Sequence, residues 1–111
     1  MKSLIIVIIL AISVLVLSCG DYSRPKAPDF SVTDIQGKTY TLAGLENKGV
    51  IFLHFWSLGT PQNKQDMIDI ADGFQRWEQT VSFLSIDVGD TEADVRDFVR
   101  NKGYRWIFCT D

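Results

Sequence analysis

The chain has 111 residues, with 11 lysines or arginines and 14 aspartates or glutamates, so its net charge is −3 at pH 7. This length accommodates one small domain, and the scattered basic residues form no patch suited to nucleic acid. Two cysteines and one histidine exclude a framework of several disulfides and a metal site rich in cysteine and histidine.

The first 18 residues are typical of a secretory signal peptide. An almost wholly aliphatic run, Leu4 to Leu17, follows a lysine and is shorter than the about 20 residues of a membrane-spanning helix. The run ends at Ser18 and Cys19, and a small residue followed by cysteine resembles a bacterial lipobox. This resemblance implies lipid attachment at Cys19 and an exported lipoprotein anchored at a membrane of the cell envelope. The alternative is an ordinary signal peptide, or an uncleaved anchor, with an incidental cysteine.

Residues 19–28 are predicted to form a polar, proline-punctuated tether, and residues 29–111 the domain. If Cys19 carries lipid, Cys109 is the one remaining thiol. Counting then excludes an intramolecular disulfide.

A β-hairpin is predicted at the start of the domain. Residues 30–33 and 38–42 alternate apolar and polar side chains, and Gly37 stands between them where a turn requires positive φ. Residues 43–48 are expected to form one helical turn that ends at Gly49.

The centre of the chain is predicted to form a strand, a turn and a helix. Residues 50–56 are almost continuously apolar, which is typical of a central strand covered on both faces. Thr60 is a suitable N-cap, and Pro61 suits the first helical position. Five side chains then recur at helical spacing and predict a buried stripe: Met67, Ile70, Ala71, Phe74 and Trp77.

Two further strands are predicted over residues 81–88 and 105–109. A helix between them begins near Thr91, in a capping arrangement, and closes at Gly103. The alternation of strand and helix predicts an α/β fold with parallel strands and right-handed crossovers.

Several segments of the chain match the pattern of a known family. Residues 27–30 (Ala-Pro-Asp-Phe) with 34–38 resemble its opening, and residues 50–57 resemble its central strand. Residues 64–67 resemble its segment after the active site, residues 81–87 its second core strand, and residues 94–103 with 106–111 its later insert. That family comprises the membrane-tethered redoxins of the TlpA and ResA type, in the AhpC/TSA-redoxin superfamily. The resemblance implies a thioredoxin-like fold with an N-terminal β-hairpin.

Members of that family carry two cysteines that flank a dipeptide, and the second cysteine resolves the mixed disulfide that the first one forms. The resemblance places Thr60 at the attacking position and Asn63 at the resolving position, with Pro61 and Gln62 between them. A threonine hydroxyl cannot replace a thiolate, because its pKa is far too high and its alkoxide forms no reducible bond to sulfur. We therefore expect no dithiol exchange and a residual role in binding an exported protein or peptide. Trp56, beside the turn, is a candidate contact residue.

Residues 60–62 also fit the Thr-Pro-x-Cys pattern of one peroxiredoxin branch. Asn63 stands where that branch has its sulfur, and Trp56 stands near where it has a proline. The alternative function is therefore a peroxiredoxin-like or single-thiol oxidoreductase that uses Cys109 or a cysteine beyond Asp111. In an apolar strand, however, a cysteine is more often a small buried side chain.

The family pattern continues beyond Asp111 with a helix, a cis-proline loop, two antiparallel strands and a last helix. The resemblance thus implies a domain whose C-terminal ββα portion is missing, and those strands would flank residues 50–56. Without them the strand would expose an unpaired edge. The chain is then a fragment of a longer reading frame, or something else covers that edge.

The other polar side chains are predicted to be structural. His54 is expected to be packed and hydrogen-bonded on its strand. Asp66, Asp69 and Asp72 recur about one helical turn apart, which is typical of a solvated helix face. The three tryptophans are expected to supply core area, and we expect neither a cofactor nor a metal site.

Overall fold

The computed structural model describes residues 24–111. The predicted signal peptide, residues 1–18, and the predicted lipid attachment at Cys19 lie outside the described residues. Residues 24–30, which include the end of the predicted tether, form no helix or strand. No helix within residues 24–111 combines the length and the apolar character needed to cross a bilayer.

The predicted hairpin is confirmed. It consists of β1 (Ser31–Thr33) and β2 (Thr39–Thr41), which pair in antiparallel fashion. The Asp34 carboxylate closes the turn by accepting two backbone amide hydrogens, each at 2.9 Å. Gly37 has φ +88°, a conformation that residues with a Cβ rarely adopt. The short helix α2 (Leu42–Glu46) follows directly.

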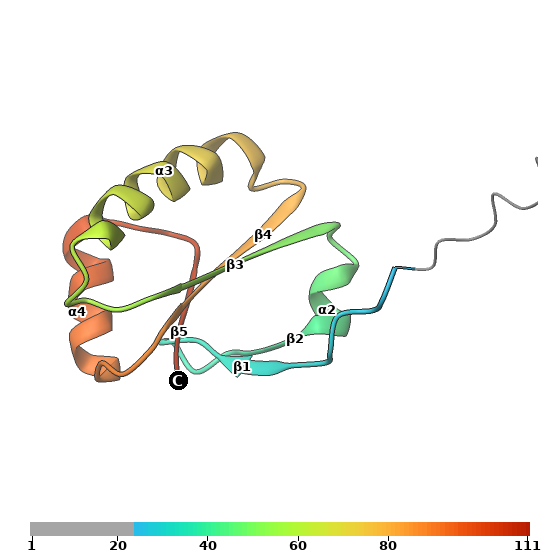
Figure 1. Cartoon of the computed structure of the whole chain (residues 1–111), viewed down its shortest axis with the longest axis horizontal. Coiled ribbons are helices and arrows are strands. Elements are labelled where there is room, and N and C mark those ends of the chain that lie inside the picture. The colour runs from blue at the N-terminus through green and yellow to red at the C-terminus, as the bar shows by residue number, and fades with distance from the viewer. Residues whose placement is uncertain (1–23) are drawn as a thin grey trace, which may run out of the picture.

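The main sheet has three parallel strands in the order β3-β4-β5. They are β3 (Val50–Trp56), β4 (Val81–Asp87) and β5 (Ile107–Thr110), and β3 pairs with β4 along its whole length. The predicted α/β fold with parallel strands is therefore confirmed. Because all three strands run in one direction, the loops that follow β3 and β4 emerge at the same end of the sheet (Figure 1).

The crossover helices are α3 (Gln62–Trp77) and α4 (Glu92–Lys102). The predicted cap of α4 is confirmed, since the Thr91 hydroxyl accepts a hydrogen bond from a first-turn amide at 3.2 Å. Gly103 ends the helix in the left-handed conformation, with φ +70°. Both helices cover one side of the sheet, whereas the hairpin and α2 lie on the other side (Figure 1).

A buried hydrophobic cluster lies between the sheet and the two crossover helices, and half of its buried members are aromatic. Trp56 packs against Phe98 of α4, with ring centroids 5.3 Å apart, and against Phe108 of β5 at 6.0 Å. The buried members of this cluster are Ile35, Trp56, Met67, Ile70, Phe83, Val95, Trp106 and Phe108. Burial of each large side chain contributes about 1.5–3 kcal/mol. The cluster therefore fixes the end of β3, from which the predicted site departs.

Two predictions about burial were wrong. Within residues 24–111, β3 has the unpaired edge that the family resemblance predicted. The prediction that both faces of this strand are covered was wrong, because Val50 and Phe55 are 65% and 63% exposed. Trp77 shares the periodicity of the buried stripe but is 58% exposed. The cause is common to both errors, because no described segment lies beyond β3 to cover the strand or the end of α3.

Candidate functional site

The two predicted site positions lie where β3 leads into α3: Thr60 is in the turn, and Asn63 is in the first turn of α3. Their side chains converge on Ser57: the Thr60 and Ser57 hydroxyl oxygens lie 2.9 Å apart, and the Asn63 side-chain amide donates to the Ser57 carbonyl. Hydrogen bonds therefore join both positions, at which the family resemblance places cysteines, to Ser57.

The predicted N-cap at Thr60 was wrong. The helix begins one residue later than Pro61, which occupies the cap position, and no side-chain hydrogen bond caps the helix. The Thr60 hydroxyl is engaged by Ser57, so it is not used on a backbone amide of the first turn. The positive end of the α3 dipole would stabilise a thiolate at this place. The Thr60 hydroxyl and the Asn63 carboxamide do not ionise near neutral pH, so neither provides a negative charge for the helix dipole to stabilise.

A pair of acidic side chains supports the turn from the end of β4. The Asp90 carboxylate accepts the Leu58 backbone amide at 2.7 Å, and the Asp87 carboxylate accepts the Asp90 amide at 2.9 Å. Asp87 is fully buried, and one of its oxygens has no hydrogen-bond partner among the described residues. Burial, followed by the neighbouring Asp90, raises the pKa of the Asp87 carboxyl to about 6. Sequence analysis did not single out this pair, and the signal for it is an aspartate at the end of an apolar strand.

Asp87→Asn is expected to stabilise the fold at neutral pH and to flatten its pH dependence. Between pH 3.8 and about 6 the folded chain retains a proton that the unfolded chain releases, so stability falls as pH rises through this window. The free energy of unfolding falls by about 1–3 kcal/mol by pH 7. The asparagine side chain does not titrate, so it avoids this loss, and its carbonyl oxygen can still accept the Asp90 backbone amide. Thermal unfolding at pH 4 and pH 7 measures the effect, and Asp97→Asn on exposed α4 is the control. A variant with the wild-type pH dependence would contradict this account.

His54 belongs to a buried polar network beneath the turn. Its Nδ1 lies 3.2 Å from the Ser85 hydroxyl, which also accepts the Trp106 indole hydrogen at 2.9 Å. Asp66 is 3.9 Å from Nε2, yet burial outweighs this carboxylate and lowers the pKa of His54. The predicted packed and hydrogen-bonded role is confirmed. Within the described part of the chain, no cluster of three potential metal ligands exists.

Cys109 lies on β5, separated from the turn by β4. It is fully buried and faces the hairpin side. There, the backbones of Asp34 and Cys109 form an isolated antiparallel β-bridge. Burial, with a smaller contribution from Asp34, raises the pKa of the thiol to about 11. A reactive cysteine needs access and a lowered pKa, and Cys109 has neither. The predicted burial of Cys109 is confirmed.

The structure places Trp56 in the core, where it is only 4% exposed. The accessible apolar surface beside the turn comes instead from Phe55 and Val88, which are 63% and 49% exposed and which sequence analysis did not single out. They border a shallow hollow of about 390 Å³, lined by Phe55, Trp56, Ser57, Thr60, Asn63 and Val88. The candidate site thus combines a polar turn with exposed apolar side chains beside it.

A parallel α/β sheet preceded by a hairpin, with its site at a strand–turn–helix junction, defines the class of thioredoxin-like redoxins. The chain belongs to the AhpC/TSA family, whose model matches residues 24–111. Its relatives make it a redoxin of the ResA and TlpA type. It is 31% identical over 87 residues to the thiol-disulfide oxidoreductase ResA of Bacillus thuringiensis (strain Al Hakam), covering 78% of this chain and 50% of that protein. The ResA of Bacillus subtilis (strain 168) is 31% identical over 86 residues, covering 77% and 48% of the two chains.

Solved structures support the same fold. A thiol:disulfide interchange protein of the thioredoxin family from Chlorobium tepidum TLS superimposes with a TM-score of 0.73 at 19% identity, covering 83% of this chain and 63% of that one. A putative thioredoxin from Neisseria meningitidis gives a TM-score of 0.69 at 26% identity, covering 77% and 57%. The chain spans about half the length of the curated relatives that it matches.

Proposed function

We propose that this chain is a membrane-tethered, thioredoxin-like protein that has lost dithiol exchange and binds a partner beside the turn after β3. The observation that carries the proposal is the hydrogen bonding of Thr60 and Asn63 to Ser57 at the two positions where the family pattern has cysteines. The similarity to ResA supports descent from a thiol-disulfide oxidoreductase.

The chemistry of the side chains supports the loss of activity. Exchange requires a thiolate to attack a disulfide and a second thiol to release the mixed disulfide. Neither Thr60 nor Asn63 supplies sulfur, and Cys109 is buried with a raised pKa on another strand. The same burial speaks against a peroxidase-like or single-thiol reaction at Cys109.

The partner that fits the remaining surface is an unfolded or extended exported polypeptide with apolar side chains. The hollow beside the turn offers exposed apolar groups at its rim and hydrogen-bonding groups at its base. Such a mixture suits a peptide, whose backbone is polar and whose side chains are apolar.

Val88→Ser is expected to weaken binding of an unfolded polypeptide about tenfold, because burial of an exposed valine contributes about 1.5 kcal/mol. The probe is reduced, carboxymethylated α-lactalbumin, which is unfolded and carries no free thiol, and the measurement is a fluorescence titration. Ile68→Ser is the matched control, since Ile68 is 59% exposed on α3 and does not line the hollow. Equal affinity of the two variants, or no binding by the native chain, would refute the proposed binding role.

Cys19→Ser is expected to release the protein from the membrane fraction when the full chain is expressed in a bacterial host. The native chain should begin at Cys19 and carry acyl groups there. At least two acyl chains are expected, because one chain alone does not give stable anchoring. Intact mass spectrometry measures both the cleavage site and the acylation. A native mass that lacks acyl chains would contradict the tether.

A further inference from the structure

A second hollow lies at the opposite edge of the sheet from β3, between α4, the hairpin turn and the loop that enters β5. Its volume is about 420 Å³, and it shares no lining residue with the hollow beside the turn after β3. The hairpin turn reaches this edge because the Ile35 backbone amide donates to the Phe108 carbonyl of β5 at 2.9 Å. The walls of the second hollow are therefore built by the segments around β5, and β3 takes no part in them.

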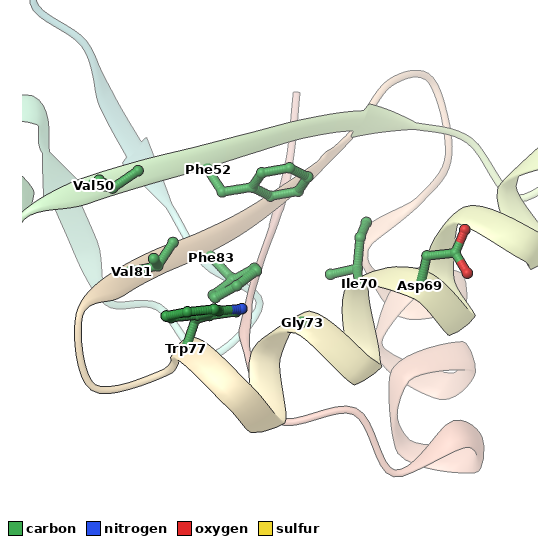
Figure 2. Close-up of a pocket in the computed structure, with 8 residues that line it drawn as sticks. All are labelled: Val50, Phe52, Asp69, Ile70, Gly73, Trp77, Val81 and Phe83. Atoms are coloured by element: carbon green, nitrogen blue, oxygen red, sulfur yellow. The ribbon is translucent and has the colours of Figure 1, made fainter.

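The chemistry of this hollow contrasts with that of the groove between β3 and α3. In Figure 2, the labelled side chains of that groove are apolar except for Asp69. The second hollow is lined by Arg96, Arg100 and Arg105, and no carboxylate lines it. The chain has only 11 basic residues and a net charge of −3, so three arginines at one place form a local excess of positive charge. We call this place the arginine hollow.

The fold brings together arginines that are separated in the sequence. Arg96 and Arg100 lie one turn apart on α4, where like charges repel each other. Gly103 then ends the helix with φ +70°, and the chain turns so that Arg105 lines the same hollow. Arg100 and Arg105 are exposed and form no ion pair within the part of the chain that the structure describes. Their charges are therefore available to an anion from outside.

Arg96 is held in place before any ligand binds. Its Nε and Nη2 groups donate to the Ile35 carbonyl at 3.3 and 2.9 Å, and Nη2 also donates to the Glu92 carboxylate. Its other amino group, Nη1, takes no part in these contacts and keeps two donors. Tyr104 forms a fixed part of the wall, because its ring packs on Trp106 with centroids 4.6 Å apart. Such preorganisation lowers the entropy that binding costs.

We propose that the arginine hollow binds the phosphate group of a small molecule or of a lipid headgroup. A guanidinium group presents paired N–H donors that match two oxygens of a carboxylate or a phosphate. A carboxylate has one charge and two oxygens, whereas a phosphate monoester has a charge of about −1.5 to −2 and three acceptor oxygens. Three arginines therefore match phosphate better. The volume lies in the range of small-molecule sites, so the group attached to the phosphate is also accommodated.

The first test is a titration of the full chain, in a non-ionic detergent, with inorganic phosphate. The nuclear magnetic resonance signals of the arginine Nε–H groups report binding, and we expect them to shift in a saturable way. Arg105→Gln is expected to weaken binding about tenfold, because it removes a charge-assisted hydrogen bond to the phosphate. Arg100→Gln should have a similar effect, and both variants replace exposed side chains.

Lys102→Gln is the matched control. Lys102 is an exposed cation in the last turn of α4 and does not line the arginine hollow. Its replacement removes the same charge from the chain and should leave the affinity for phosphate nearly unchanged. Equal weakening by Lys102→Gln and the two arginine variants would show a general effect of charge and overturn the proposal. A native chain whose arginine signals do not shift would overturn it too.

Two further probes define the ligand. Acetate should bind at least about tenfold more weakly than phosphate, because it has fewer charges and oxygens, and equal binding of the two anions would contradict a phosphate site. Glycerophosphoglycerol is the soluble headgroup of phosphatidylglycerol. Tighter binding of this diester than of inorganic phosphate would assign the arginine hollow to a membrane lipid, and the reverse order would assign it to a soluble phosphate compound.

Discussion

A variant with cysteine at both Thr60 and Asn63 is expected to form a reversible disulfide and to exchange it with small disulfides. The backbone already has the required geometry, because the backbone N–H of Asn63 donates to the backbone carbonyl of Thr60 at 3.1 Å. Residues joined in this way have Cα atoms less than about 7 Å apart, and disulfides span Cα separations of about 4.4–6.8 Å. The thiols would replace the hydrogen bonds to Ser57, so closure of the turn is preserved.

The thiol at position 60 should also be the more reactive of the two. It would lie one residue before the cap of a 16-residue helix, where the helix dipole favours a negative charge. Cysteine thiols at helix N-termini have a pKa of about 7 or below, compared with about 8.5 for an ordinary cysteine. A chromogenic aromatic disulfide is a suitable substrate, because it requires no peptide-docking surface.

The control for this experiment is Thr60→Cys alone, and both variants also carry Cys19→Ser. A single thiol should form a mixed disulfide that persists, because no second thiol resolves it. In both variants the first attack releases one half of the substrate as a thiol. Only the double variant should then release the other half, because its second thiol breaks the mixed disulfide and forms the internal disulfide. If the double variant instead accumulates mixed disulfide as the single variant does, the turn does not have the geometry of a dithiol site.

Local sequence signals predicted most of the fold because each one depends on residues close in the chain. The alternation before and after Gly37 defined the hairpin, and Thr91 and Gly103 bounded α4 through capping contacts within one turn. The continuous apolar run of residues 50–56 identified β3 with its bounds. The apolar run alone could not show that β3 lies at the edge of the described sheet, since that depends on which segments lie next to it. The family resemblance, and not the run, predicted this edge.

The sequence predicted where Thr60 and Asn63 lie in the fold, but not the contacts that their side chains make. Sequence placed Thr60 and Asn63 at the junction of β3 and α3, yet the hydrogen bonds to Ser57 depend on how the loop folds back. The same limit explains Trp77, which has the spacing of a core residue but lacks a neighbour on one side. Asp87 required knowledge of the whole packing, because an aspartate at a strand end is buried only when helices and strands close around it.

The central claim, that the native chain performs no dithiol exchange, is tested by its effect on the reduction of insulin by dithiothreitol. In a Cys19→Ser background the only thiol is Cys109, which is fully buried and has a pKa of about 11. At pH 7 only about 1 in 10,000 such thiols is ionised, and solvent does not reach it. We predict that the chain leaves the rate of insulin precipitation unchanged. An acceleration that disappears with Cys109→Ala would contradict the account.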